Sequence, residues 1–189
     1  MDKVCIFCGS NSGNNNLYQK AVLDLIEIIK KERMEIIYGG GKVGLMGLVA
    51  TEAIKSKVYI TGIMPEFLID REIAHNQIDK LIKVRDMSER INMMADLSNG
   101  FLILPGGFGT FEELFEVLSW SQMGLHEKPI GVLNINGFFN PIIDLINNTV
   151  NSGFAPEKNK ELIIIDSSVE NLLSKMKNFK HELPNKYMN

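Results

Sequence analysis

The stretch that decides the fold is FLILPGGFGTFEELFEVL, residues 101–118. Its first four residues are apolar throughout, which is typical of a strand buried on both faces. A turn with three glycines in four positions follows, and after it Phe111, Leu114, Phe115 and Leu118 recur at helical spacing. A strand, a glycine-rich turn and a helix in this order indicate the α/β class, with a ligand site at the turn.

Further apolar runs of strand length occur along the chain, separated by segments with helical period. The seven runs are Val4–Phe7, Ile36–Tyr38, Val58–Ile63, Leu81–Val84, Phe101–Leu104, Ile130–Leu133 and Leu162–Ile165. The first segment between them carries Tyr18, Val22, Leu25 and Ile29 at the spacing of an amphipathic helix. We therefore predict a Rossmann-like, doubly wound parallel sheet of about seven strands, with helices on both faces and right-handed crossovers.

Size and charge narrow the class of protein further. With 189 residues, 45% of them hydrophobic and 23% charged, the chain suits one domain, which we expect over residues 1–183, with a frayed tail over 184–189. A net charge of -3, with Lys and Arg scattered, gives no basic footprint for nucleic acid or a membrane surface. No apolar stretch approaches the roughly 18 residues that span a bilayer, and no secretory segment is recognisable, so we expect a cytoplasmic protein.

The two cysteines, Cys5 and Cys8, are spaced like half of a zinc site, but no second pair exists. Residues three apart in an extended strand point to opposite faces, so we expect both thiols to be buried and inert. The histidines His75, His126 and His181 are isolated in the sequence. We expect no metal and no organic cofactor.

Three turns are rich in glycine, after the first, second and fifth predicted strands. In the second, Gly39, Gly41 and Gly44 match the spacing of a dinucleotide fingerprint, but the next predicted strand ends without the acid that would bind the ribose. Lys42 precedes Val43 rather than Ser or Thr, so this turn is not a nucleoside-triphosphate P-loop either.

The turn at Pro105–Thr110 is better suited to an anion, because its glycines let backbone N–H groups approach a phosphate at a helix N-terminus. Thr110 and Glu113 also have the spacing of a capping box, which is a purely structural alternative. Glu112, Glu113 and Glu116 crowd the start of this helix, where the macrodipole favours acids. Three acids together make capping alone an incomplete explanation.

A second candidate is Arg90, in the segment Met87-Ser88-Glu89-Arg90. We expect Met87, Ile91, Met94 and Leu97 to form the buried stripe of its helix. At the edge of that stripe Arg90 could extend its guanidinium to solvent. Alternatively, packing could hold the guanidinium in place to grip an anion or a carboxylate.

At these residues the sequence resembles the Lonely Guy (LOG) family, whose members are often mislabelled as lysine decarboxylases. The family pattern Pro-Gly-Gly-x-Gly-Thr-x-x-Glu is complete over residues 105–113, and Met87–Arg90 is similar to the family's Met-x-x-Arg-Lys segment. The similarity spans roughly residues 3–155. It includes Tyr38-Gly39-Gly40-Gly41, Val43–Gly47, Ile63–Pro65, Lys128–Asn134 and Gly137–Phe139.

The resemblance implies a homodimer, or a higher homo-oligomer, that hydrolyses the N-glycosidic bond of adenine-type nucleoside 5′-monophosphates without a cofactor. It implies that Arg90 and Glu113 are catalytic and that the substrate meets the following residues: Gly9, Ser10, Glu72, Arg90, Gly106, Gly107, Phe108, Gly109, Thr110, Glu112, Glu116 and Ser119. Two positions depart from the family, Ile91 for its Lys and Ser119 for its Thr, and they leave base preference and phosphate affinity open.

A different class of function stays open beside the hydrolase. The same glycine loops would serve a nucleotide-binding or carrier module that cleaves nothing. A decarboxylase is disfavoured, since no residue is identifiable as a Schiff-base lysine. Residues Arg90 and Glu113 favour the hydrolase.

Overall fold

The structure is a computed structural model, and it describes residues 1–69 and 74–182. The strands are β1 (Lys3–Phe7), β2 (Glu35–Tyr38), β3 (Ile60–Pro65), β4 (Lys80–Val84), β5 (Gly100–Ile103), β6 (Ile130–Leu133) and β7 (Ile163–Asp166). The helices are α1 (Asn16–Lys31), α2 (Gly44–Ser56), α3 (Glu66–Ile69), α4 (Met87–Leu97), α5 (Phe108–Gln122), α6 (Asn140–Asn151) and α7 (Val169–Lys177). Two 3-10 turns, η1 (Ile135–Gly137) and η2 (Glu157–Leu162), flank α6.

The seven strands form one sheet in the order β4-β3-β2-β1-β5-β6-β7, and each neighbouring pair is parallel. Strand number, strand direction and fold class are confirmed. Only boundaries differ, as for β3, which begins two residues later than predicted. Val58 lies outside it because its N–H bonds to Ala53 O and closes the end of α2, where Lys57 has a positive φ of 57°.

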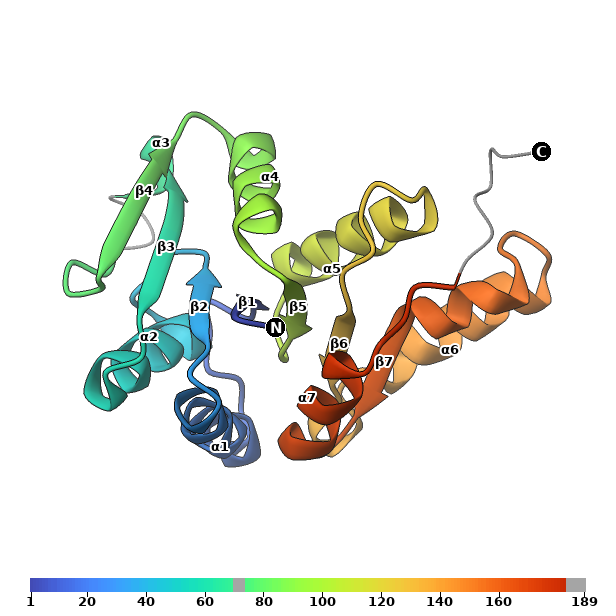
Figure 1. Ribbon diagram of the computed structural model, residues 1–189, viewed down its shortest axis with the longest axis horizontal. Coiled ribbons are helices and arrows are strands. Elements are labelled where there is room, and N and C mark those ends of the chain that lie inside the picture. Colours follow the sequence, from blue (N-terminus) through green and yellow to red (C-terminus); the bar gives the residue numbers. More distant parts are fainter. Residues whose placement is uncertain (70–73, 183–189) are drawn as a thin grey trace.

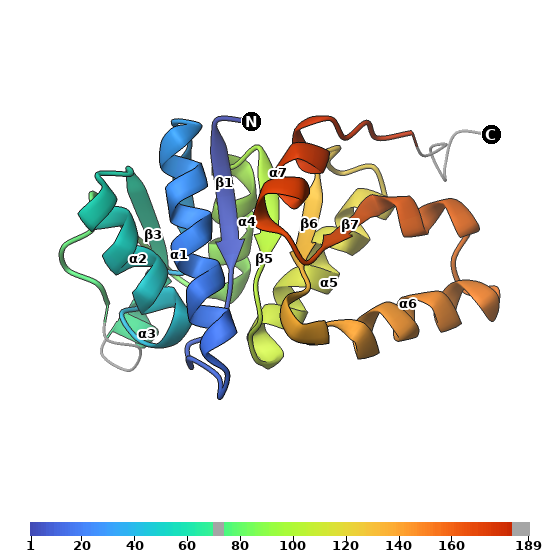
Figure 2. The ribbon, with the colours of Figure 1, turned by 90° about the horizontal axis from the view of Figure 1, so that it is seen from below.

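Helices cover both faces of the sheet, as Figures 1 and 2 show. One apolar core lies under α1, α2 and α7 and contains Leu25, Val49 and Leu172. The other lies under α4 and α5 and contains Met94 and Leu114. Because both faces are covered, the inner strands are mainly apolar, which is the feature that indicated parallel pairing, whereas the edge strand β4 carries the exposed Lys80 and Lys83.

Strand β1 lies in the middle of the sheet. The chain adds β2, β3 and β4 on one side of it and then β5, β6 and β7 on the other. Strand β1 pairs with β2 on one side and with β5 on the other. The strand order therefore reverses beside β1, and in open α/β sheets ligands bind beyond the carboxyl ends of the strands at such a switch point. The three glycine-rich turns follow β1, β2 and β5, so the topology brings all three to this one edge.

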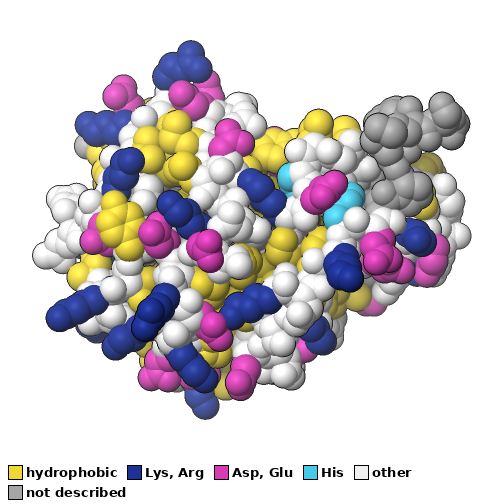
Figure 3. All heavy atoms as spheres, viewed as in Figure 1, with side chains coloured by type: hydrophobic (Ala, Val, Ile, Leu, Met, Phe, Trp, Pro, Cys, Tyr) yellow, Lys and Arg dark blue, Asp and Glu magenta, His cyan; other side chains and the backbone are white. Residues whose placement is uncertain are grey.

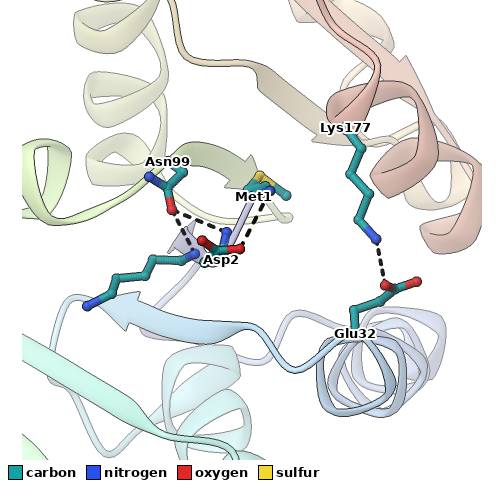
Figure 4. A network of polar contacts seen from close by, with 6 residues as sticks. Met1, Asp2, Glu32, Asn99 and Lys177 are labelled. Atoms are coloured by element: carbon teal, nitrogen blue, oxygen red, sulfur yellow. Dashed lines mark hydrogen bonds and ion pairs between the residues drawn. The ribbon is translucent and has the colours of Figure 1, made fainter.

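The opposite, amino-terminal edge is held by a polar network (Figure 4). The Asn99 side-chain oxygen accepts hydrogen bonds from the backbone N–H groups of Asp2 and Lys3, at 3.2 and 3.0 Å. Lys177 on α7 forms an ion pair of 2.7 Å with Glu32 at the end of α1. These contacts fix the start of β1 and tie α7 to α1, at the edge away from the glycine turns.

No helix in the described residues is both long and apolar enough to cross a membrane. On the face seen in Figure 3, basic and acidic side chains are interspersed, without an extended field of one sign. This distribution agrees with the scattered charges of the sequence.

Candidate active site

Helix α5 begins earlier than its sequence suggested. Its N-cap is Gly107, no side chain caps it, and its first residue is Phe108. Thr110 is therefore the third helical residue, and it is buried. The capping-box interpretation is wrong, because Glu113 lies in the second turn and not opposite an N-cap. The macrodipole does not account for the acids either, since the first turn contains none and the effect fades beyond it.

Helix α4 carries Arg90 and has a well-defined start. The Asp86 side chain caps it by accepting a hydrogen bond of 2.8 Å from the Glu89 N–H. In turn the Glu89 carboxylate accepts bonds from the backbone N–H and the Nε of Arg85, at 2.8 and 3.0 Å. The arrangement resembles a capping box, except that Glu89 accepts from Arg85 instead of the N-cap Asp86, and it fixes the first turn of α4 immediately before Arg90.

The buried face of α4 is centred on Arg90, Ile91, Met94 and Ala95. The predicted stripe is thus partly wrong, because Met87 and Leu97 are each 38% exposed. The helix is rotated so that its arginine, rather than its first methionine, faces the sheet.

The guanidinium of Arg90 is buried, since the residue is only 4% exposed. Its Nη2 donates a hydrogen bond of 2.9 Å to the backbone oxygen of Gly39, at the carboxyl end of β2. Its Nη1 lies 3.7 Å from the sulfur of Met87. Of the two alternatives for Arg90, extension to solvent is wrong, and packing holds the guanidinium against the edge of the sheet.

Arg90 shares a small cavity of about 50 Å³ with the acids of α5. Its lining residues are Met87, Ser88, Arg90, Ile91, Glu112, Glu113 and Glu116. Glu113 and Glu116 are partly buried, and Glu112 is exposed. The two candidate catalytic residues, from helices on different sides of β5 in the sequence, thus meet at one site.

The charges at this site affect the pKa values of two buried thiols, Cys5 and Cys8. Burial raises the pKa of Cys5 well above its ordinary value, the negative charge of Glu113 raises it further, and the positive charge of Arg90 lowers it. Burial and the charge of Glu113 also raise the pKa of Cys8. Cys5 and Cys8 contribute to opposite cores, as the strand periodicity predicted. Both thiols stay protonated at neutral pH and are poor nucleophiles.

A larger cavity of about 250 Å³ lies between the turns after β1 and β5. Its lining residues are Gly9–Gly13, Tyr18, Leu45, Pro105–Gly107 and Phe138. The two turns are in backbone contact, because the Gly9 N–H donates a 3.1 Å hydrogen bond to Pro105 O. Four of the predicted substrate residues, Gly9, Ser10, Gly106 and Gly107, line this cavity.

Tyr18 and Phe138 form an aromatic wall of the larger cavity, which was not predicted from the sequence. The rings of Tyr18 and Phe138 meet edge to face with centroids 5.9 Å apart. Tyr18 was expected only as part of the buried stripe of α1, and Phe138 only as part of a matched segment. Their contact joins α1 to the turn after β6, which no local pattern reveals.

Among the other predicted substrate residues, Phe108, Gly109 and Ser119 line neither of these two cavities. Phe108 is 91% exposed at the first position of α5, beside the exposed Gly109. Ser119 lines a third cavity, of about 230 Å³, together with residues of α6 such as Leu145. Glu72 lies outside the described residues, as does the tail over 184–189.

The glycines of the β2 turn accommodate groups of the protein itself. A Cβ at Gly39 would overlap the Arg90 guanidinium, and one at Gly44, where φ is 64°, would overlap the backbone of Ser10 and Asn11. A pyrophosphate could not approach these positions as it does in dinucleotide-binding proteins. The expectation that no acid stands at the end of the next strand is wrong, since β3 extends to Pro65 and is followed directly by the exposed Glu66.

The histidines serve as local contacts. The ring of His126 lies 2.8 Å from Val117 O through Nε2 and accepts the Lys128 N–H through Nδ1. His181 Nε2 lies 3.2 Å from Ser121 O. Among residues 1–69 and 74–182, no group of three or more His, Cys, Asp or Glu side chains could hold a metal ion.

The fold and this edge define a class of protein, namely a Rossmann-like α/β protein with a charged and glycine-lined site at its topological switch point. The chain belongs to the family described as possible lysine decarboxylases, which matches residues 46–176 and includes the Lonely Guy proteins. The membership confirms the resemblance seen in the sequence.

Two relatives from Arabidopsis thaliana illustrate the relationship. The cytokinin riboside 5′-monophosphate phosphoribohydrolase LOG5 is 39% identical over 178 residues, which are 94% of this chain and 78% of that protein. The cytokinin riboside 5′-monophosphate phosphoribohydrolase LOG2 is 38% identical over 182 residues, which are 95% of this chain and 85% of that protein.

Solved structures share the fold at low sequence identity. The molybdenum cofactor binding protein of Rippkaea orientalis has a TM-score of 0.68 and 20% identity, with coverage of 94% of this chain and 96% of that chain. The Moco carrier protein of Chlamydomonas reinhardtii has a TM-score of 0.69 and 17% identity, with the same coverage. At such identities the likeness concerns the fold alone.

Proposed function

We propose that this chain is a phosphoribohydrolase that cleaves the N-glycosidic bond of adenine-type nucleoside 5′-monophosphates, releasing the free base and ribose 5-phosphate. The observation that carries the proposal is that Arg90 and Glu113 line one cavity at the switch point. The names of the relatives and the family membership support the same chemistry.

In the proposed reaction, water adds through its oxygen to C1′ of the ribose as the bond from C1′ to the base nitrogen breaks. One proton of that water ends on the departing base, so no other reactant is consumed. Positive charge builds on the ribose in the transition state, and a fixed carboxylate stabilises it. We assign this role to Glu113, which is partly buried beside a buried guanidinium.

Arg90 has two roles in this proposal. Its charge is held away from water, where electrostatic interactions are stronger than at the surface. It orients the carboxylates of α5 and provides donors toward the substrate. We assign Glu116, which lines the same cavity, to holding Arg90 and Glu113 in place. We assign the exposed Glu112 to contact with the substrate.

We assign the 5′-phosphate to the start of α5. Residues Gly107 to Thr110 supply N–H groups that no side chain caps, and the positive end of the helix dipole favours an anion there. Gly9 and Ser10 face the same larger cavity from the turn after β1. Binding of the phosphate positions the ribose against Glu113, so energy from a remote group serves the reacting carbon.

The rival class is a nucleotide-binding or carrier module on the same fold. It would bind a nucleoside monophosphate without cleaving it, and a buried arginine could serve it as an anion contact, but it gives no role to the three glutamates that line the same cavity. Decarboxylation by Schiff-base chemistry needs a lysine, and the described residues that line the two cavities include none. The hydrolase is therefore the function that the site supports best.

We also propose a homodimer or a higher homo-oligomer. Large apolar side chains are exposed on and after α5 and around α6, among them Phe115, Leu125, Leu145 and Phe154. Of these, Phe115 and Leu145 line one cavity, and exposed apolar patches mark protein contacts. Light scattering at micromolar concentration tests the proposal, and a fully active monomer of 21.3 kDa would contradict it.

The function is tested by incubating the purified protein with a panel of 5′-monophosphates, namely AMP, an N6-prenylated AMP, GMP and CMP. Chromatography of the free base is expected to show release from one or both adenine nucleotides. Absence of any free base from the whole panel, with the protein folded, would overturn the proposal.

A further inference from the structure

Gly39, directly after β2, contacts the proposed active site through Arg90. Gly39 is not among the residues that line the two cavities. Yet its backbone oxygen accepts the 2.9 Å hydrogen bond from Arg90 Nη2, across 51 residues of sequence. This contact links a glycine with no expected role in the reaction to the proposed catalytic cation.

The space beside Gly39 is filled by the arginine. A Cβ built on Gly39 would overlap Nη2 of Arg90 and lie 3.2 Å from its Cζ. The third of the three nearest atoms is the sulfur of Met46, also at 3.2 Å. The φ of Gly39 is not among the positive values, so alanine fits the backbone here and the restriction is purely one of space.

We propose that Gly39 is a positioning residue for Arg90, acting through its carbonyl oxygen, which holds Nη2, and through its missing side chain, which leaves room for the guanidinium. The inference rests on the proposed function for its effect on catalysis, but the contact itself can be tested separately. It assigns a use to the first glycine of a turn that otherwise resembles a dinucleotide fingerprint.

A methyl group added at Gly39 displaces whichever neighbouring group moves most easily. The guanidinium is the end of a flexible side chain, whereas the backbone of β2 is paired to β1 and β3 on both sides. Gly39→Ala therefore displaces Arg90 and leaves the sheet in place. A misplacement of about 1 Å in a catalytic group costs on the order of 100-fold in rate.

The test is a double-mutant cycle with the wild type, Gly39→Ala, Arg90→Ala and the double variant. Melting temperature and the kcat and KM for base release from AMP are measured on each. Gly39→Ala is expected to lower the melting temperature by about 5 °C when Arg90 is present, through loss of a buried charged hydrogen bond, and by much less in the Arg90→Ala background. With Arg90 present it is expected to lower kcat by on the order of 100-fold. Because Arg90→Ala is expected to abolish turnover, the melting temperatures complete the cycle.

Met46 supplies a matched control for the other close contact. Met46→Ala removes the sulfur, so combining it with Gly39→Ala relieves that contact and leaves the overlap with Arg90. We expect the combined variant to keep the kcat defect of Gly39→Ala. Recovery of kcat would show that the methyl group acts through Met46, and the proposal would be wrong.

Two further results would overturn the proposal. One is an equal loss of melting temperature from Gly39→Ala with and without Arg90, and the other is a Gly39→Ala variant with wild-type kcat and KM. If the wild type releases no base, the proposed function fails, while the melting temperatures still decide whether Gly39 holds Arg90.

Discussion

Replacement of Glu113 by glutamine separates its chemical role from any structural one. The residue lies in the second turn of α5, away from the N-cap at Gly107, so it makes no capping contribution to lose. Glutamine has nearly the shape and helix propensity of glutamate and keeps an oxygen that can accept a hydrogen bond, so the melting temperature should fall far less than the activity. The main change is the loss of one negative charge beside Arg90.

The expected loss of activity is much larger than the loss of stability. Removing one preorganised electrostatic group costs on the order of 100-fold in kcat, or about 2.7 kcal/mol at 1.36 kcal/mol per tenfold change. The assay is chromatographic release of base from AMP, with melting and AMP binding measured on the same preparation. Glu27→Gln, at an exposed position of α1, is the matched control and should match the wild type in all three. Near-normal base release by folded Glu113→Gln would refute the carboxylate role.

Further predictions concern the phosphate, the glycine turn and pH. AMP should be cleaved far faster than adenosine, since the start of α5 is the proposed anion site; equal rates at matched concentrations would contradict this. Gly106→Ala should melt well below the wild type, because its Cβ would lie 2.8 Å from the Gly9 nitrogen, whereas Gly109→Ala, with open space, should keep its melting temperature and raise the KM for AMP. Burial lowers the pKa of His126 below 6.5, so the unfolded chain binds protons more readily and stability should fall as the pH drops below 6.5. His126→Gln should weaken this dependence in melting curves, and an unchanged pH profile would show that other groups cause it.

The sheet could be predicted well from the sequence because a strand leaves a local pattern of residues. Most of the strands are short, mainly apolar runs, and such runs indicate parallel strands buried on both faces. The start of α5 was predicted three residues late, because Thr110 has the composition of an N-cap while Gly107 provides the backbone geometry without a side-chain signal. Local sequence patterns indicate which residues favour an N-cap position, but tertiary contacts decide where the helix begins.

The candidate site was predicted in its chemistry and only partly in its geometry. Arg90 and Glu113 were identified from motifs, and the structure places both at one cavity. The contact between Arg90 and Gly39 joins residues far apart in sequence, and the aromatic wall of Tyr18 and Phe138 does the same. Single-sequence periodicity carries no information on such pairs, so they required the three-dimensional arrangement.

The central claim is that the chain cleaves a nucleoside monophosphate rather than only binding it. The most direct measurement follows AMP, adenine and ribose 5-phosphate over time in one reaction, with AMP in excess over the protein. We expect adenine and ribose 5-phosphate to accumulate in equal amounts over many turnovers, and Arg90→Ala to abolish the formation of both. If AMP instead binds stoichiometrically and is recovered intact, the chain is a carrier and not a hydrolase.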